Sequence, residues 1–129
     1  MNQGIEAVTT AALGLALDAA SLRQDAIASN IANVDTIGYV PMSVSFEDQL
    51  GAARRSLQSD GRLDAAALDG VAPRLEQATD QTPAGSTNPV SLDLEVARLT
   101  QNSGHYQELA KALSKHFGIL SMAVSDGKK

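Results

Sequence analysis

Two histidines and a glutamate are the residues of this sequence best suited to chemistry. His105 and Glu108 are three positions apart, so a helix would bring them to one face, where imidazole and carboxylate can bind a metal ion. Carboxylate-bridged metal sites in helical bundles use the opposite order, Glu-x-x-His, and take further ligands from other helices. His116 lies more than two helical turns further on. We therefore interpret both histidines as exposed or interface residues and predict no metal site.

Other catalytic patterns are absent from the sequence. It has no cysteine, no Gly-x-Ser-x-Gly and no Gly-rich phosphate loop. The net charge is −5 and the pI is about 4.8, and the few basic residues form no stripe, which argues against a nucleic-acid partner. The sequence therefore predicts a protein that is not an enzyme, with no cofactor, no small-molecule substrate and no nucleic acid.

The composition limits how much of the chain can be buried. Only 3% of the 129 residues are aromatic and there is no Trp, so the chain cannot build a thick core, and we expect a partner to complete the burial. The first twenty residues have no basic region and carry Glu6 and Asp18, so we expect no cleavable signal peptide. We also expect no apolar run long enough to span a bilayer.

Apolar residues near the N-terminus recur in alternating steps of three and four, the pattern of a coiled-coil seam. These positions are Ile5, Val8, Ala12, Leu15, Ala19, Leu22, Ala26 and Ser29. A second stripe through Leu13, Leu17, Ala20, Ile27 and Ile31 widens the apolar face, so this helix should contact more than one neighbour. Whether those neighbours lie in the same chain or in another stays open, with about even weight on each.

The middle of the chain lacks the heptad pattern of the N-terminal segment. Residues 34–90 predict a turn, a short extended segment with Pro41 at an edge, a short helix capped by Ser45, and a mobile insert from about Ser59 to Asn88. Within the insert, Arg62–Leu68 and Val71–Leu75 alternate weakly, without a sustained period.

A second heptad helix follows, with Ser91 as its N-cap and acidic residues in its first turn. Its apolar positions are Leu92, Val96, Leu99, Ser103, Tyr106, Ala110, Leu113, Phe117, Leu120 and Val124. The predicted fold is mainly α: residues 1–33 and 91–125 form one helical rod domain, an α-helical coiled-coil pair. Residues 34–90 contribute the turn, the short helix and a flexible, loop-rich middle.

Between the first helix and the extended segment lies an Asn-rich stretch. Its side chains can bond to neighbouring backbone, and Gly38 can adopt the positive φ that closes a turn. The stretch comprises Ser29, Asn30, Ile31, Ala32, Asn33, Val34, Asp35, Thr36, Ile37, Gly38 and Tyr39. It resembles the N-terminal signature of flagellar rod, hook and hook-filament junction proteins. The family usually has proline at position 37 and a basic residue at position 40, where this chain has Ile and Val.

The segment from Val90 to Tyr106 is similar to the C-terminal region of flagellar basal-body rod proteins, and the short length resembles the proximal-rod type. This resemblance implies a structural subunit of the periplasmic rod, exported unfolded by the flagellar type III apparatus and assembled with other rod proteins and copies of itself. The implied assembly interface comprises Ile5, Val8, Ala12, Leu15, Leu22, Leu92, Val96, Leu99, Tyr106, Leu113, Phe117 and Leu120.

Phe46 and Leu50 stand four apart, which places both on one face of a helical turn. The pair resembles the Phe-x-x-x-aliphatic signal by which early flagellar substrates engage the export gate, and packing of the short helix explains it equally well. An alternative function of a different class is a soluble helical adaptor or export chaperone, which would have similar amphipathic helices and acidic charge.

Overall fold

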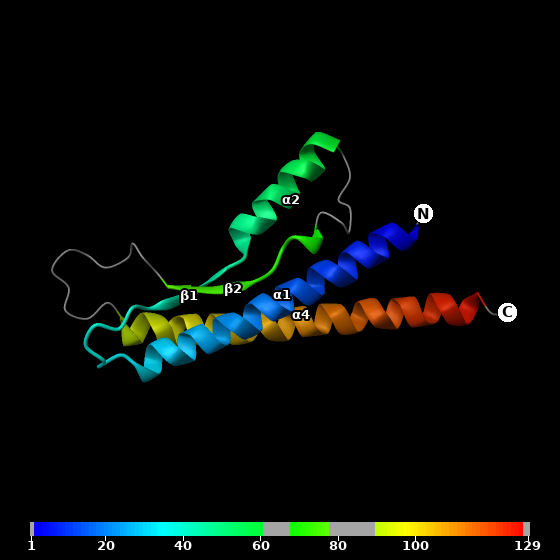
Figure 1. Ribbon diagram of the computed structural model, residues 1–129. Coiled ribbons are helices and arrows are strands. Elements are labelled where there is room, and N and C mark those ends of the chain that lie inside the picture. Colours follow the sequence, from blue (N-terminus) through cyan, green and yellow to red (C-terminus); the bar gives the residue numbers. More distant parts are fainter. Residues whose placement is uncertain (1, 61–67, 78–89, 128–129) are drawn as a thin grey trace.

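The computed structural model describes residues 2–60, 68–77 and 90–127 (Figure 1). Along the chain they form helix α1 (Asn2–Ala32), strand β1 (Met42–Ser45), helix α2 (Glu47–Asp60), strand β2 (Arg74–Gln77) and helix α4 (Leu92–Asp126). Figure 1 shows α1 and α4 packed along one another in opposite directions, with the strands and α2 on one side of them. The prediction of a mainly helical fold built on two long packed terminal helices is confirmed.

The middle of α1 is covered by its own chain. α1 packs on α4 and also on both strands. Its most buried apolar residues include Ala19, Ala20 and Ala26, whose small side chains let neighbouring elements approach closely. The prediction that this helix contacts more than one neighbour is confirmed, and in the middle of α1 those neighbours belong to the same chain.

α1 also corrects an expectation about membranes. The stretch Ile5–Ala32 is long and apolar enough, by length and composition alone, to cross a bilayer, contrary to the expectation from sequence. Only 11% of the apolar window within this stretch is buried in the structure. In this structure α4 and the two strands lie on its apolar surface.

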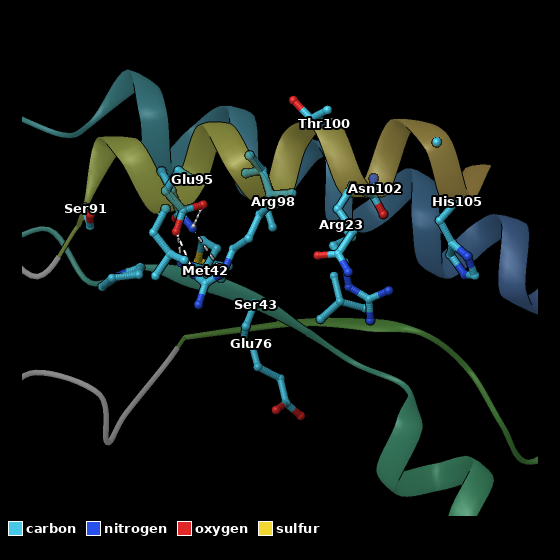
Figure 2. A pocket seen from close by; sticks show the side chains of 18 of the residues that line it. Arg23, Met42, Ser43, Glu76, Ser91, Glu95, Arg98, Thr100, Asn102 and His105 are labelled. Carbon is cyan, nitrogen blue, oxygen red and sulfur yellow. Dashed lines mark hydrogen bonds and ion pairs between the residues drawn. The ribbon is translucent and has the colours of Figure 1, made fainter. Parts of the chain in front are cut away.

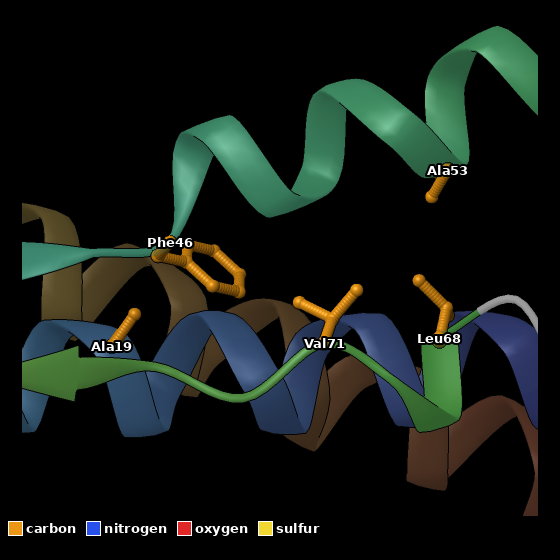
Figure 3. Close-up of a cluster of buried hydrophobic side chains, with 5 residues drawn as sticks. All are labelled: Ala19, Phe46, Ala53, Leu68 and Val71. Carbon is orange, nitrogen blue, oxygen red and sulfur yellow. The ribbon is translucent and has the colours of Figure 1, made fainter.

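A small apolar cluster joins α1 to the rest of the chain (Figure 3). Its buried members are Ala19, Phe46, Ala53, Leu68 and Val71, and the residues packed against them are Val8, Ala11, Ala12, Leu15, Val44 and Leu50. Phe46 is the one aromatic ring in the cluster, and burying such a side chain contributes about 1.5–3 kcal/mol. The cluster holds the segment from β1 to β2 against one side of α1.

Part of the predicted mobile insert, residues 68–77, contains regular structure that the sequence did not indicate. β2 pairs with β1 in an antiparallel sheet, with Met42 opposite Gln77 and Ser45 opposite Arg74. Leu68 and Val71 are buried in the cluster. The sequence shows no period here because each apolar residue contacts a partner far away in the chain, not one on its own element. The rest of the predicted insert, residues 61–67 and 78–89, lies outside the described residues.

The short helix begins one residue later than predicted. The backbone N–H of Leu50 donates to the carbonyl of Phe46 at 3.1 Å, so Phe46 and not Ser45 occupies the N-cap position. The Gln49 side chain then reaches across to Ala72, donating to its carbonyl at 2.8 Å and accepting from its N–H at 2.9 Å. This paired contact ties the start of α2 to the segment that leads into β2.

Candidate functional site

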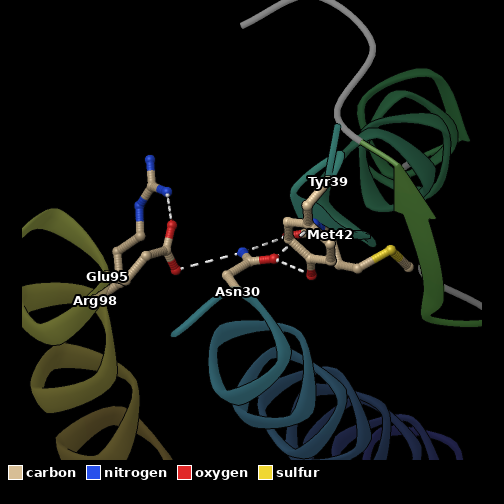
Figure 4. A network of polar contacts seen from close by, with 5 residues as sticks. All are labelled: Asn30, Tyr39, Met42, Glu95 and Arg98. Carbon is tan, nitrogen blue, oxygen red and sulfur yellow. Dashed lines mark hydrogen bonds and ion pairs between the residues drawn. The ribbon is translucent and has the colours of Figure 1, made fainter. Parts of the chain in front are cut away.

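The Asn-rich stretch is organised around the carboxamide of Asn30, which is only 2% exposed (Figure 4). Its Oδ1 accepts from the N–H of Met42 at 2.7 Å and from the Tyr39 hydroxyl at 2.8 Å, and its Nδ2 donates to the carbonyl of Met42 at 3.0 Å. The side chain therefore pairs with residue 42 as a neighbouring strand would. This contact fixes both the position and the orientation of β1 against the end of α1.

The expectation that Asn30 bonds to neighbouring backbone is therefore wrong, since its partner lies twelve residues away. Asn33 does behave as expected: its Nδ2 donates to the carbonyl of Ser29 at 2.8 Å, and its Oδ1 accepts from the Thr36 hydroxyl at 3.1 Å. Asp35 is exposed, and within the described part of the chain its side chain makes no hydrogen bond. Of these three short polar side chains, Asn30 and Asn33 thus form hydrogen bonds, and Asp35 does not contribute one within the described part of the chain.

Gly38 closes the turn with a φ of +79°, which confirms the predicted positive φ. The N–H of Tyr39 donates to the carbonyl of Thr36 at 3.3 Å, so Ile37 and Gly38 are the two central residues of a turn of type II character. Proline is favoured at the first central position, which this chain fills with an Ile that is 97% exposed. The turn returns Tyr39 to Ser29, and their hydroxyl groups lie 3.0 Å apart.

Two polar residues of α4 complete the contact between the long helices. Glu95 is 3% exposed; its Oε2 lies 3.4 Å from Asn30 Nδ2, and its Oε1 accepts from Arg98 at 2.8 Å. Asn102 is also buried, and its Nδ2 donates to the Ala20 carbonyl at 2.9 Å and to Gln24 Oε1 at 3.0 Å. Polar contacts across a helix pair specify register, because a shift would leave these groups unpaired.

Sequence reasoning missed these buried polar residues. Glu95 reads as a first-turn acid that favours the helix dipole, and nothing in its spacing predicts burial. Asn102 lies one position before Ser103, which occupies a position of the predicted heptad. Ser91 is the N-cap residue as predicted, although its side chain makes no capping hydrogen bond. A polar residue beside an otherwise apolar seam is the one signal that could have pointed to Asn102.

The apolar stripe of α4 divides into two rows. The inward row faces α1 and is buried or half-buried: Glu95, Leu99, Asn102, Leu109, Leu113, His116 and Leu120. The outward row is exposed: Leu92, Val96, Ala110, Phe117 and Val124. Leu94, Tyr106, Ile119 and Met122 are further exposed apolar residues of the same helix. The whole outward row belongs to the predicted heptad, whereas only Leu99, Leu113 and Leu120 of the inward row do. The predicted heptad thus contributes both to the contact with α1 and to an uncovered apolar surface.

The histidines take the positions expected of exposed or interface residues. His105 is exposed, as is Glu108. His116 is half-buried between the helices, with its Nε2 3.1 Å from the Thr10 hydroxyl. Among the described residues, no group of three or more His, Asp or Glu side chains could hold a metal ion.

An open groove of about 1030 Å³ lies between α4, α1 and β1 (Figure 2). Two of its lining arginines are paired: Arg98 binds Glu95 at 2.8 Å, and Arg23 binds Glu47 of α2 at 2.6 Å. His105, Glu108 and Glu76 also line it, and all three are exposed. Figure 2 shows the Glu76 side chain pointing away from the helices, so it does not converge with the other charges. Among the described residues, no group of three or more His, Asp or Glu side chains converges in this groove, so it offers no metal site.

Comparison with known proteins indicates a structural role for this chain. Residues 13–39, which span much of α1 and the whole Asn-rich turn, match the family described as flagella basal body rod protein. The flagellar basal body rod protein FlgB of Bacillus subtilis (strain 168) is 31% identical over 117 residues, covering 88% of this chain and 90% of that protein. This chain belongs to the FlgB family.

Two enterobacterial members of the FlgB family give similar values. The Escherichia coli (strain K12) protein is 29% identical over 77% of this chain and 80% of its own length, and that of Salmonella typhimurium (strain LT2) is 30% identical over 71% and 75%. The chain is thus a structural, non-enzymatic subunit of the flagellar basal-body rod, as the resemblance implied. Membership favours the rod subunit over the alternative of an adaptor or export chaperone.

The residues implied for the assembly interface of this FlgB-family chain separate into two groups. Val8, Ala12 and Leu15 pack against the intramolecular cluster, and Leu22 is half-buried. Leu99, Leu113 and Leu120 belong to the inward row of α4. The exposed members are Ile5, Leu92, Val96, Tyr106 and Phe117. Phe46 is buried in the cluster and Leu50 packs against it, so the folded chain does not present this pair on its surface.

Proposed function

We propose that this FlgB-family subunit joins the rod through the outward row of α4, which packs against a helix of a neighbouring rod protein or another copy of the chain. The observation that supports this is the exposure of the row: Phe117 is 50% exposed and Val124 is 60% exposed. Heptad positions left in water are typical of a helix whose partner is another molecule.

The exposed face of α1 provides a matching surface of small and short side chains. Ala7, Asp18, Ser21, Asp25 and Ala28 are exposed and recur with helical spacing along α1. A helix with small residues on one face accepts the larger side chains of another helix at short interaxial distance. The outward row of one subunit and this face of the next therefore form a heterologous contact, which extends into a helical rod because it does not close on itself.

The test separates assembly from folding with a matched pair of substitutions on α4. Phe117→Asp places a carboxylate in the outward row, and Ser114→Asp places the same group at an exposed polar position in the same turn. We expect both purified variants to unfold within about 0.5 kcal/mol of the parent chain, because neither position is buried. In cells, Phe117→Asp should abolish recovery of the subunit in isolated basal bodies, whereas Ser114→Asp should not. Normal incorporation of Phe117→Asp would refute the proposed contact.

We further propose that the chain is exported unfolded by the flagellar type III apparatus, and that Phe46 and Leu50 act as its signal before they are buried. Their burial supports this order, since the pair is accessible only in an unfolded chain. A groove that binds two apolar side chains one turn apart would capture them from such a chain.

Packing and signalling can be separated through a second residue of the same cluster. Phe46→Ala removes both functions, whereas Val71→Ala weakens the same buried cluster and leaves the Phe-x-x-x-Leu pair intact. Secreted and cytosolic protein are measured for each variant. A signal predicts that Phe46→Ala lowers secretion at least tenfold more than Val71→Ala does. Equal secretion of the two variants would show that Phe46 serves only in packing.

A further inference from the structure

Among the described residues, no strand pairs with the outer edge of β2, which is a second candidate surface. All four residues of β2, Arg74–Gln77, are exposed. β1 pairs with the opposite edge. A two-stranded sheet is marginal by itself, and an unpaired edge offers backbone donors and acceptors to another strand.

The hydrogen bonds of Asn30 reveal which backbone groups of β2 point outward. Because the N–H and carbonyl of Met42 both bind Asn30, they point away from β2, so Met42 and Gln77 are a pair without mutual hydrogen bonds. Such pairs alternate along an antiparallel ladder. Val44 and Leu75 are therefore also such a pair, and the N–H and carbonyl of Leu75 point to the open edge.

The side chains on either side of Leu75 carry opposite charges. Arg74 precedes it and Glu76 follows it, and both are exposed. If a second β2 lies antiparallel with the two copies of Leu75 opposite each other, Arg74 of each copy lies opposite Glu76 of the other. Opposite charges directly across a ladder stabilise it, and like charges weaken it. The edge is thus complementary to itself in backbone, charge and apolar contact.

We propose that β2 pairs with β2 of a second copy of this chain, antiparallel and about a two-fold axis at Leu75, giving a four-stranded sheet in the order β1, β2, β2, β1. The contact is small compared with the roughly 1,200 Å² or more that stable interfaces bury, so the pair forms at high local concentration of the chain. It uses neither row of α4 and is independent of the assembly contact proposed above.

Disulfide trapping tests the register, because the chain has no cysteine of its own. Leu75→Cys places two thiols opposite each other across the axis, where Cα atoms of a hydrogen-bonded pair are about 5.5 Å apart, within reach of a disulfide. Gln77→Cys is the control, because its symmetry mate lies four positions away along the ladder, roughly 13 Å. We expect at least tenfold faster cross-linking of the Leu75→Cys chain. Equal rates for the two chains would indicate random collision and overturn the proposal.

Charge exchange tests the pairing itself in the Leu75→Cys background, using two chains of different tag length. Arg74→Glu and Glu76→Arg each place like charges opposite one another, so each should lower its own cross-linking about tenfold. Mixing the two variants restores opposite charges at both positions and should restore the rate in the mixed dimer. Within the chain both residues face serines, Ser45 and Ser43, so neither change opposes a charge in the hairpin.

Failure of the mixture to exceed either variant alone would overturn the pairing. Phe117→Asp is the last control, because it disables the assembly contact of α4 and should leave the trapping rate of Leu75→Cys unchanged. A loss of trapping in that variant would assign the contact to α4 and not to β2.

Discussion

The two ends of the α1–α4 pair differ in what completes them. At the end that carries the turn, Asn30, Tyr39 and Glu95 form a hydrogen-bonded network that includes the backbone of Met42. At the other end Ile5 is 71% exposed, and α4 presents Ile119, Met122 and Val124 to solvent. Hydrogen bonds within the chain fix the first end, although Leu92 and Val96 of the outward row are exposed there too. A subunit built this way has a fixed shape at one end and exposed apolar surface along α4.

Removing the Asn30 carboxamide should have the largest effect on the hydrogen-bonded end of the α1–α4 pair. Asn30→Ala leaves the Met42 N–H and carbonyl without their partner and removes one of the two partners of the Tyr39 hydroxyl. We expect a loss of about 2–4 kcal/mol in the free energy of unfolding. Urea denaturation followed by circular dichroism measures it. Asn33→Ala, which removes contacts at the half-buried turn, should cost about 1 kcal/mol. Equal losses for the two variants would contradict the central role of Asn30.

Truncation at the inward row should affect the folded chain more than truncation at the open end. Leu113→Ser removes a half-buried side chain that faces α1, and we expect a cost of about 2 kcal/mol. Met122→Ser alters a side chain that is mostly in water and should change stability by less than about 0.5 kcal/mol. Thermal unfolding of the two variants side by side gives the comparison, and similar costs would mean that the open end is covered in the monomer.

Two glycines should respond with opposite sign to the same substitution. A Cβ on Gly38 or on Gly104 would meet no atom within 4 Å, so backbone conformation decides the outcome. Gly38→Ala forces alanine to a φ of +79° and should cost about 1 kcal/mol. Gly104→Ala fills an exposed position inside α4 and should add about 0.5–1 kcal/mol of stability. Chemical denaturation of both variants measures the difference, and a gain from Gly38→Ala would exclude the strained turn.

The smallest expected change is a stabilisation at the tip of the turn. Ile37→Pro pre-sets the φ that this position of the turn requires, and the side chain it replaces is almost fully exposed. We expect a gain of about 0.4–1 kcal/mol, chiefly because the unfolded chain loses conformations. The melting temperature of the variant checks the sign, and a clear decrease would show that the backbone at Ile37 does not fit proline.

The helices were predictable because their signal is local. The contacts between residues far apart in the sequence were not predictable. Heptad spacing over α1 and α4 predicted both elements. The same spacing could not indicate which apolar residues of α4 contact α1. Val96 of the outward row and Leu99 of the inward row both fit the predicted heptad. The packing in three dimensions decides which row meets α1, and the inward row includes two buried polar residues, Glu95 and Asn102, that an apolar pattern does not detect.

The turn and the strands show the same limit more sharply. Gly38 was predictable because positive φ is a property of the residue itself. The partner of Asn30 was not, since a carboxamide can bond to any backbone it reaches and only the fold brings Met42 within 3.0 Å. β2 escaped prediction because four exposed residues owe their extended form to pairing with β1, not to their own pattern.

The packing of α1 on α4 has a kinetic consequence. Thr10 and His116 are in contact across 106 positions of sequence, and the Asn30–Glu95 and Ala20–Asn102 contacts span 65 and 82. Closing such large loops delays folding relative to a bundle of sequential helices, since chain entropy is lost before the contacts reward it. During synthesis, α1 also waits for the ribosome to reach α4 before its apolar face is covered. We therefore expect a newly synthesised chain to stay unfolded for longer than a bundle of sequential helices would.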